Sequence, residues 1–167
     1  MSMPVVDVIC EHEPWEAIPG LLPRIEQAVE AALAASGVAL LPAAEVSVLL
    51  SDDATIAGLN ARWRGKAAPT NVLSFPSVEA GKLASSKVVG DIILAYETCV
   101  REAVDESKTL SDHLTHLAVH GALHLVGYDH ENDADAAVME ALECRVLAAL
   151  GVADPYADPV AAPEARA

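Results

Sequence analysis

The alternation of apolar and polar residues along the chain predicts four strands. Residues 45–51, EVSVLLS, alternate with a period of two, and residues 5–10, VVDVIC, alternate more weakly. Residues 88–95, VVGDIILA, form a nearly continuous apolar run, which is typical of a buried strand. The fourth strand, NVLSFP at 71–76, is short and ends at a proline. These segments together predict a small sheet.

Apolar residues spaced three and four apart predict helices in the rest of the chain. The expected helices cover 23–37, the segment from a cap at 51–53 to Gly65, the residues from Glu97 onward, about 111–126, and a last segment capped by Asp133 and stopped by Gly151. The element order is therefore β-α-β-α-β-β-α-α-α. This order predicts one α/β (α+β) domain with a small mixed four-stranded sheet surrounded by helices.

The length of 167 residues and the apolar share of 53% suit a single domain with a proper core. We expect that domain over residues 1–153, followed by a flexible C-terminal tail over 154–167 that is rich in proline, alanine and acids. No apolar run is long enough to cross a membrane, and the amino terminus lacks a signal-peptide pattern. The three cysteines are widely separated, as in a reducing compartment. The sequence therefore predicts a cytoplasmic protein without a membrane partner, and it leaves the oligomeric state open.

The net charge of −15 is unevenly distributed along the chain. Between Arg62 and Lys87 lie five bases and one acid, a local charge of +4, so the remainder carries −19. A basic segment on an acidic body can hold a phosphate chain, but it can equally be a solvated surface loop. Charge alone leaves both interpretations open.

The stretch HGALHLVGYDH contains three histidines and a glycine at the spacing H-x-x-x-H-x-x-G-x-x-H. His120 and His124 lie one helical turn apart, so both imidazoles share one face of the predicted helix. Gly127 can end that helix and reverse the chain, which brings His130 toward the same point. Three neutral imidazoles leave one coordination position open, as in a catalytic zinc site. We therefore predict one Zn²⁺ per chain on a zincin-like histidine helix, although imidazole also suits nickel, copper or iron.

Two polar residues near these histidines have alternative interpretations. His116 lies on the same helical face one turn earlier, where it packs, forms a hydrogen bond or lines the cleft rather than binding the ion. Asp129 either orients a ligand imidazole or accepts a hydrogen bond from its own backbone in the turn. The sequence does not decide between these roles.

Gly121 stands where a zinc peptidase has the glutamate that takes the proton of the metal-bound water. Phosphodiester cleavage depends more on a cation that stabilises charge on the phosphoryl oxygens. A site without that glutamate but with an arginine therefore favours a phosphate substrate over a peptide.

Two separate motifs closely resemble the signatures of the YbeY family of bacterial rRNA maturation factors. They are HGALHLVGYDH at 120–130, and RGKAAPTNVLSFP at 64–76 followed by GDIIL at 90–94. EALECRVLAALGVADPY at 140–156 is similar as well, and the resemblance spans about residues 40 to 156. One departure is the pair Ala67-Ala68, where family members often have charged residues.

The resemblance implies an α/β fold and a zinc-dependent endoribonuclease that acts on single-stranded RNA. It further implies a role in small-subunit rRNA 3′-end maturation and in ribosome quality control. The implied zinc ligands are His120, His124 and His130, and the implied functional arginine is Arg64. The expected partners are ribosomal RNA and the small ribosomal subunit, with ribosomal proteins or assembly GTPases as further candidates.

Arg64 presents a planar fork of donors that suits a phosphate, but it can equally bond the last carbonyls of its helix. The candidate substrate contacts are Lys66, Asn71, Ser74 and His116. Two other functions are kept as alternatives: a zinc peptidase of metzincin-like spacing, and a ribosome-associated binding module whose zinc is structural.

Overall fold

The fold was analysed in a computed structural model that describes residues 3–65 and 68–157. The elements are β1 (Val5–Cys10), the 3₁₀ helix η1 (Glu13–Ala17), α1 (Leu21–Ser36), β2 (Glu45–Ser51), α2 (Asp53–Arg64), β3 (Val72–Pro76), the 3₁₀ helix η2 (Ala80–Ser85), β4 (Val88–Ala95), α3 (Tyr96–Asp105), α4 (Leu110–Leu125) and α5 (Asp133–Ala149). Their order confirms the predicted β-α-β-α-β-β-α-α-α sequence of strands and α-helices. The two 3₁₀ helices were not predicted, because such short turns leave no periodic pattern.

Local sequence explains where several helices begin and end. Asp52 accepts a hydrogen bond from the backbone N–H of Thr55 at 2.8 Å, so it caps α2 as predicted. Gly65 ends α2 with a φ of 72°, a left-handed conformation that glycine adopts without steric cost. The cap of α5 was predicted one residue too late: Asn132, not Asp133, accepts from the backbone N–H of Asp135. Both residue types cap well, so the sequence could not choose between them.

The four strands form one sheet in the order β1-β2-β4-β3. β1, β2 and β4 are parallel, and β3 pairs antiparallel with β4. The predicted mixed sheet is therefore confirmed, and β3 is an edge strand. β3 pairs Ser74 with Ile92 and Phe75 with Asp91 in that ladder.

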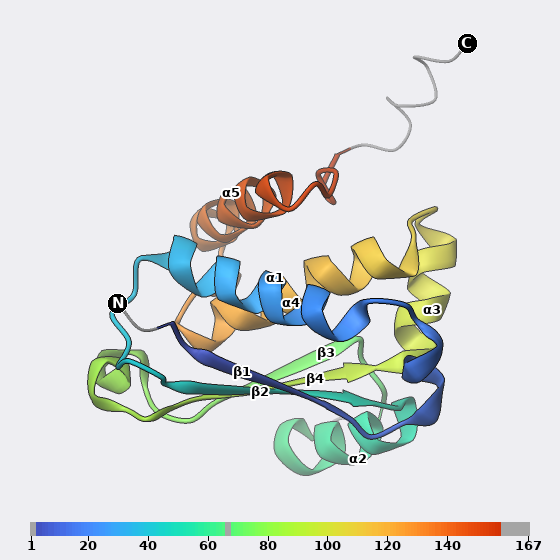
Figure 1. Ribbon diagram of the computed structural model, residues 1–167, viewed down its shortest axis with the longest axis horizontal. Coiled ribbons are helices and arrows are strands. Elements are labelled where there is room, and N and C mark those ends of the chain that lie inside the picture. Colours follow the sequence, from blue (N-terminus) through green and yellow to red (C-terminus); the bar gives the residue numbers. More distant parts are fainter. Residues whose placement is uncertain (1–2, 66–67, 158–167) are drawn as a thin grey trace.

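The two faces of the sheet are covered very differently (Figure 1). α1 and α4 lie over one face with α5 outside them, whereas α2 lies on the opposite face. The large core on the first face includes Trp15, Ile25, Val48, Leu94, Leu114 and Leu123. The cluster on the second face consists of Ile56, Leu73, Ile93 and Ala95. Burial of apolar side chains therefore stabilises the α1/α4 side far more than the α2 side.

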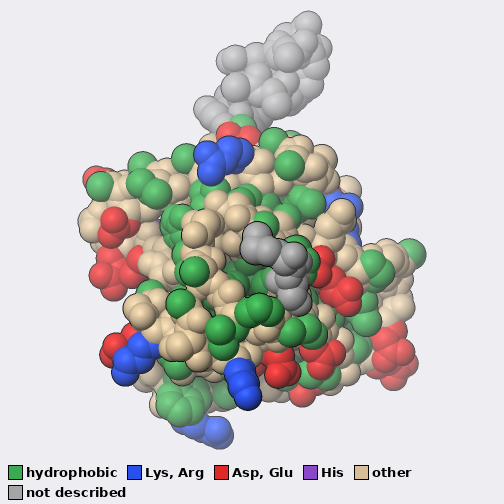
Figure 2. Space-filling view, turned by 60° about the vertical axis from the view of Figure 1, so that its left-hand side comes forward, with side chains coloured by type: hydrophobic (Ala, Val, Ile, Leu, Met, Phe, Trp, Pro, Cys, Tyr) green, Lys and Arg blue, Asp and Glu red, His purple; other side chains and the backbone are tan. Residues whose placement is uncertain are grey.

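The surface has the mixed charge expected of an acidic chain. Figure 2 shows Asp and Glu side chains spread over one face, with isolated Lys and Arg side chains between them. Among the described residues, no helix is both long and apolar enough to cross a membrane. Residues 158–167 of the predicted tail lie outside the described residues.

Candidate metal centre and cleft

α4 and the turn after it bring the three predicted ligands together. The Nε2 atoms of His120 and His124 lie 3.1 Å apart. The centroid of the His130 ring lies 5.5 Å from that of His120 and 4.9 Å from that of His124. One ligand nitrogen from each histidine lies within 4.8 Å of the other two. Two nitrogens on a tetrahedral zinc at the usual bond length lie about 3.3 Å apart. The three histidines therefore fit a zinc ion.

The turn that places His130 depends on Gly127. Its φ of 104° is open to glycine and strained for other residues, and its N–H donates to the His124 carbonyl at 3.1 Å. Tyr128 then donates its hydroxyl to the Ser36 carbonyl at 3.2 Å, which ties the turn to the end of α1. Asp129 accepts from the backbone N–H of His130 at 2.7 Å. Asp129 thus forms a local side-chain to backbone hydrogen bond within the turn, which agrees with one of its two predicted roles.

The carboxylate that orients the predicted ligand His120 is Glu143 of α5, for which no role was predicted from the sequence. Its side chain is fully buried, and Oε2 accepts from Nδ1–H of His120 at 2.7 Å. Oε1 accepts from Nε2–H of His116 at 2.9 Å and from the Tyr156 hydroxyl at 2.5 Å. An ionised carboxylate only accepts, so His120 has its proton on Nδ1 and a lone pair on Nε2. That tautomer presents Nε2 to a metal.

The pKa shifts of two groups in the site favour an ionised Glu143 carboxylate and a neutral His124 imidazole. Burial raises the pKa of Glu143, but hydrogen bonds from His116 and His120 outweigh burial and lower it to about 2. Burial lowers the pKa of His124 to about 4, and repulsion from His120 and His130 whenever those rings are protonated acts in the same direction. His124 is therefore neutral at pH 7, the form in which imidazole binds a metal.

A sequence signal for Glu143 did exist. It lies on the apolar stripe of α5 beside Met139, Leu142 and Val146, all of which are buried. A glutamate in that position needs a buried partner, because an unpaired buried charge is costly. The partner itself, 23 residues away, could not be found from periodicity.

The histidines face a cleft of about 660 Å³ that crosses the edge of the sheet. The cleft is lined by Trp63 and Arg64 of α2, residues 70–76 with β3, His120 and His124 of α4, and residues 129–131 of the following turn. A second hollow of about 610 Å³ adjoins it, sharing Pro76 and His124, and Lys82 lines this second hollow. The predicted metal ligands and Arg64 thus belong to one cleft.

Of the other predicted substrate contacts, two line the cleft, one is absent from its described lining and one lies outside the described residues. Asn71 and Ser74 line the cleft, although the Asn71 amide donates to Glu102 Oε1 at 3.0 Å and the Ser74 hydroxyl donates to the Gly121 carbonyl at 3.1 Å. His116 is absent from the described lining of the cleft and instead contacts Glu143. Lys66 lies outside the described residues. The roles of these residues in substrate binding stay predictions.

Gly121 faces the sheet at a point of close packing. A Cβ atom there would lie 2.9 Å from Ile92 Cγ2 and 3.1 Å from Ser74 Oγ. A glutamate at this position would therefore meet β3 and β4 before it could reach toward the metal. The glycine lets α4 lie flat on the sheet, which brings His120 and His124 to the edge strand.

Two further groups of possible metal ligands occur among the described residues. One contains His116, His120 and Glu143, and the other Glu102, Glu106 and His113. In the first group the nitrogens and oxygens are already hydrogen-bonded to each other, and in the second Glu102 Oε1 accepts from His113 at 2.8 Å. His120, His124 and His130 are the better metal site, because all three ring systems face the cleft.

Comparison with known proteins agrees with the motifs. A family model described as Endoribonuclease YbeY matches residues 18–151. A Methylocella silvestris protein named Endoribonuclease YbeY is 49% identical over 161 residues, which cover 96% of this chain and 90% of that protein. A Bradyrhizobium diazoefficiens protein of the same name is 50% identical over 161 residues, covering 94% of this chain and 87% of that protein.

A solved structure also has this fold. The solution structure of TM1509 from Thermotoga maritima superposes with a TM-score of 0.59 at 25% sequence identity. The superposition covers 86% of this chain and 87% of that chain. This likeness confirms the predicted fold class.

Proposed function

The chain belongs to the Endoribonuclease YbeY family, and we propose that it hydrolyses phosphodiester bonds of single-stranded RNA at a zinc ion held by His120, His124 and His130. The observation that supports this most directly is the shared cleft. Three imidazoles converge in this cleft, and Arg64 at the end of α2 lines the same cleft. The chain is thus an RNA-cleaving hydrolase of the same kind as its named relatives.

Zinc is the metal that suits the ligand set best. Three neutral imidazoles and an open fourth position are typical of catalytic zinc, and Glu143 gives His120 the tautomer that such a site needs. When bound, the ion would act as a Lewis acid toward a phosphoryl oxygen and lower the pKa of a water molecule. Among residues 3–65 and 68–157, this ligand group has three members, which favours an open site over a structural zinc.

Arg64 has the position and chemistry to bind the phosphate. It is exposed at the C-terminal end of α2 and lines the cleft. Its guanidinium offers two parallel N–H donors to phosphoryl oxygens, and its charge offsets the negative charge that develops there during cleavage. The residue thereby supplies the cation that a site without the peptidase glutamate requires.

The adjoining hollow gives an RNA chain a path beyond the metal. The two hollows meet at Pro76 and His124, so a strand that passes the metal can continue along Lys82. Arg64 and Lys82 both come from the locally basic segment of this acidic chain. This segment therefore follows the proposed path of the phosphates.

The two alternative functions have weaker support. A zinc peptidase needs a carboxylate beside the metal-bound water, and Gly121 packs against Ile92 and Ser74 instead. A binding module with a structural zinc does not need an arginine opposite an open ligand position. We place the enzyme in small-subunit rRNA 3′-end maturation and ribosome quality control in the cytoplasm, with the small ribosomal subunit as partner.

Arg64→Ala tests the proposed role of the cleft. We expect about one zinc per chain to be retained, because a guanidinium is not a zinc ligand. Single-turnover RNA cleavage should fall by roughly a hundredfold or more, the usual cost of losing one electrostatic stabiliser. Arg64→Lys should recover part of the rate, since it keeps the charge and loses the fork.

Arg62→Ala is the matched control, because Arg62 is an exposed arginine of the same helical turn that is absent from the described cleft lining. It should cleave RNA like the wild type. Equal rates for Arg64→Ala and Arg62→Ala would reduce Arg64 to a helix-end residue. Failure of the zinc-loaded wild type to cleave single-stranded RNA would overturn the proposed function itself.

A further inference from the structure

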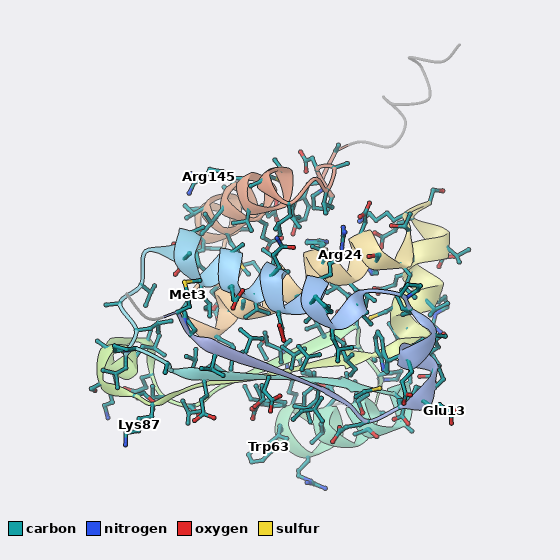
Figure 3. The ribbon with its side chains drawn as sticks, in the orientation of Figure 1. Met3, Glu13, Arg24, Trp63, Lys87 and Arg145 are labelled. Atoms are coloured by element: carbon teal, nitrogen blue, oxygen red, sulfur yellow. The ribbon has the colours of Figure 1, made fainter. Side chains whose placement is uncertain are left out.

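The two tryptophans of the chain have opposite environments. Trp15 is fully buried, and its Nε1–H donates to the Ser51 carbonyl at 2.8 Å. Trp63 is 67% exposed at the last turn of α2, and Figure 3 shows it projecting from the outer end of that helix. A large aromatic side chain left in water gives up the stabilisation of burial.

Trp63 does not belong to the core that its helical spacing predicts. Ile56, Leu59 and Trp63 share a face of α2, and Ile56 is fully buried while Leu59 is partly buried. Trp63 lies beyond the cluster that Ile56 joins. The indole is therefore not required for packing α2 on the sheet.

Trp63 lies instead at the wall of the cleft that contains the metal ligands. It lines the cleft together with Arg64, His120 and His124. Its ring centroid lies 6.3 Å from that of Phe75 on β3, with the planes tilted by 60°. Phe75 also lines the cleft and supports one part of the indole, so the indole has a defined position with a large exposed surface.

We propose that Trp63 is the stacking surface for one unpaired base of the RNA, on the nucleotide next to the phosphate that Arg64 binds. This proposal rests on the proposed function and names its specificity determinant. Trp63 and Arg64 are consecutive residues on one wall of the cleft, so one side chain can take a base while the other takes the adjoining phosphate. Base–aromatic stacking tolerates any sequence because every base has a π face.

The consequence is selection for single strands. A base in a duplex is already stacked and paired, so it can reach the indole only after it is unstacked. A base in a flexible strand reaches the indole without that cost. Trp63 would thereby favour unpaired RNA at the metal, with little preference for base identity.

Intrinsic fluorescence reports on this contact directly. Trp15 is shielded from solvent, so a change in emission on ligand binding comes from Trp63. The probe is an eight-nucleotide 2′-O-methyl oligouridylate, added to the zinc-loaded protein. We expect quenching in the wild type and none in Trp63→Phe, whose emission comes from Trp15 alone.

Affinity for the same oligomer gives the size of the effect. Trp63→Ala should weaken binding about 5- to 150-fold, the range for loss of one base–aromatic stack. Trp63→Phe should keep most of the affinity, because phenylalanine still offers a ring. Val104→Ala is the matched control, since Val104 is a 73% exposed apolar residue of α3 away from the cleft, and it should bind like the wild type.

An oligomer with one abasic position, moved along the strand, separates stacking from other contacts. At one position the missing base should weaken wild-type binding and have no further effect on Trp63→Ala. Abasic penalties that are equal in both proteins would show that Trp63 contacts the sugar-phosphate chain, and they would overturn the proposal.

Unchanged affinity in Trp63→Ala together with unchanged wild-type emission would also overturn the proposal, while RNA cleavage by the wild type would leave the proposed function intact. Conversely, quenching without any RNA cleavage would contradict the proposed function and not the stacking contact. Zinc content and melting temperature of each variant should equal those of the wild type, because Trp63 is neither buried nor a ligand.

Discussion

The two walls of the cleft are built in different ways. The histidine wall is α4, which packs on the sheet beside α1 with α5 outside both helices, and its predicted ligand His120 is hydrogen-bonded to the buried Glu143. The opposite wall is the end of α2, which covers the small cluster around Ile56 and leaves Trp63 and Arg64 exposed.

The attachment of α2 shows the same contrast. Asp53 in its first turn forms hydrogen bonds with α3 both as acceptor and as donor. Its carboxylate accepts from the backbone N–H and the hydroxyl of Thr98, and its backbone N–H donates to Glu97 Oε1 at 2.8 Å. These bonds hold the N-terminal end of α2, and the cleft residues lie at the other end.

The difference suits the two tasks proposed for the site. Metal ligands require positions held within a few tenths of an ångström, and packed helices with buried hydrogen bonds provide them. Contacts to a flexible RNA strand require donors and aromatic surface that can adjust, which side chains at an exposed helix end provide. Changes on the histidine wall should therefore affect the metal, and changes on the α2 wall should affect the substrate or the stability of α2.

The largest effect is expected for His124→Ala, compared with His113→Ala on the same helix. His124→Ala should lose most of the zinc and all measurable RNA cleavage, because it removes a ligand from an open three-histidine site. His113 is 3% exposed and bonded to Glu102 at 2.8 Å, away from the cleft. His113→Ala should keep the zinc and lower the free energy of unfolding by about 1–3 kcal/mol, since Glu102 loses its partner.

Zinc content by elemental analysis and urea unfolding measure the two outcomes. Full zinc occupancy in His124→Ala would refute the ligand assignment. Loss of zinc in His113→Ala would contradict the assignment of His124 to the metal and of His113 to the stability of the fold.

A smaller effect on the same wall is expected for Glu143→Gln. Glutamine keeps the shape but removes the charge that fixes the His120 tautomer, so zinc affinity should fall roughly 10- to 100-fold. Chelator competition measures the affinity, and nitrogen NMR of the His120 ring reports the tautomer independently of activity. Glu140→Gln is the control, because Glu140 lies on the same helix and, in the part of the chain that the structure describes, forms no hydrogen bond to a predicted ligand histidine. Equal zinc affinity in both variants would limit Glu143 to packing.

The smallest effect is expected at the start of α2, where Asp52→Ala removes the N-cap. The free energy of unfolding should fall by about 1 kcal/mol at pH 7, with zinc content and RNA cleavage unchanged. Hydrogen bonds from the side chain and backbone of Thr55 lower the pKa of Asp52 below its ordinary value of 3.8. The cap therefore stabilises the fold fully above pH 3.8 and loses that contribution as the pH falls through the lowered pKa.

Unfolding curves of the wild type and Asp52→Ala should thus converge in acid. A stability difference that persists unchanged at pH 2 would show that the Asp52 carboxylate is not the source of the effect.

The sequence by itself determined the features of this protein that depend on residues close together in the chain. The order of strands and helices followed from periodicity, because burial of one face repeats every two residues in a strand and every 3.6 in a helix. The convergence of His120, His124 and His130 was also predictable, since one helical turn and one glycine turn relate the three residues within a single segment. The zinc, the active arginine and the substrate contacts stay proposals, because a pattern of residue types does not identify a bound molecule.

Tertiary structure decided the relations between segments. Glu143 reaches His120 from another helix, and Arg64 lines the same cleft as His120 although the two residues are 56 positions apart along the chain. Trp63 has the helical spacing of a core residue, yet it is exposed at the cleft. Periodicity predicts which face of an element is apolar, but the neighbouring element and the place where the sheet ends determine which residues of that face are covered.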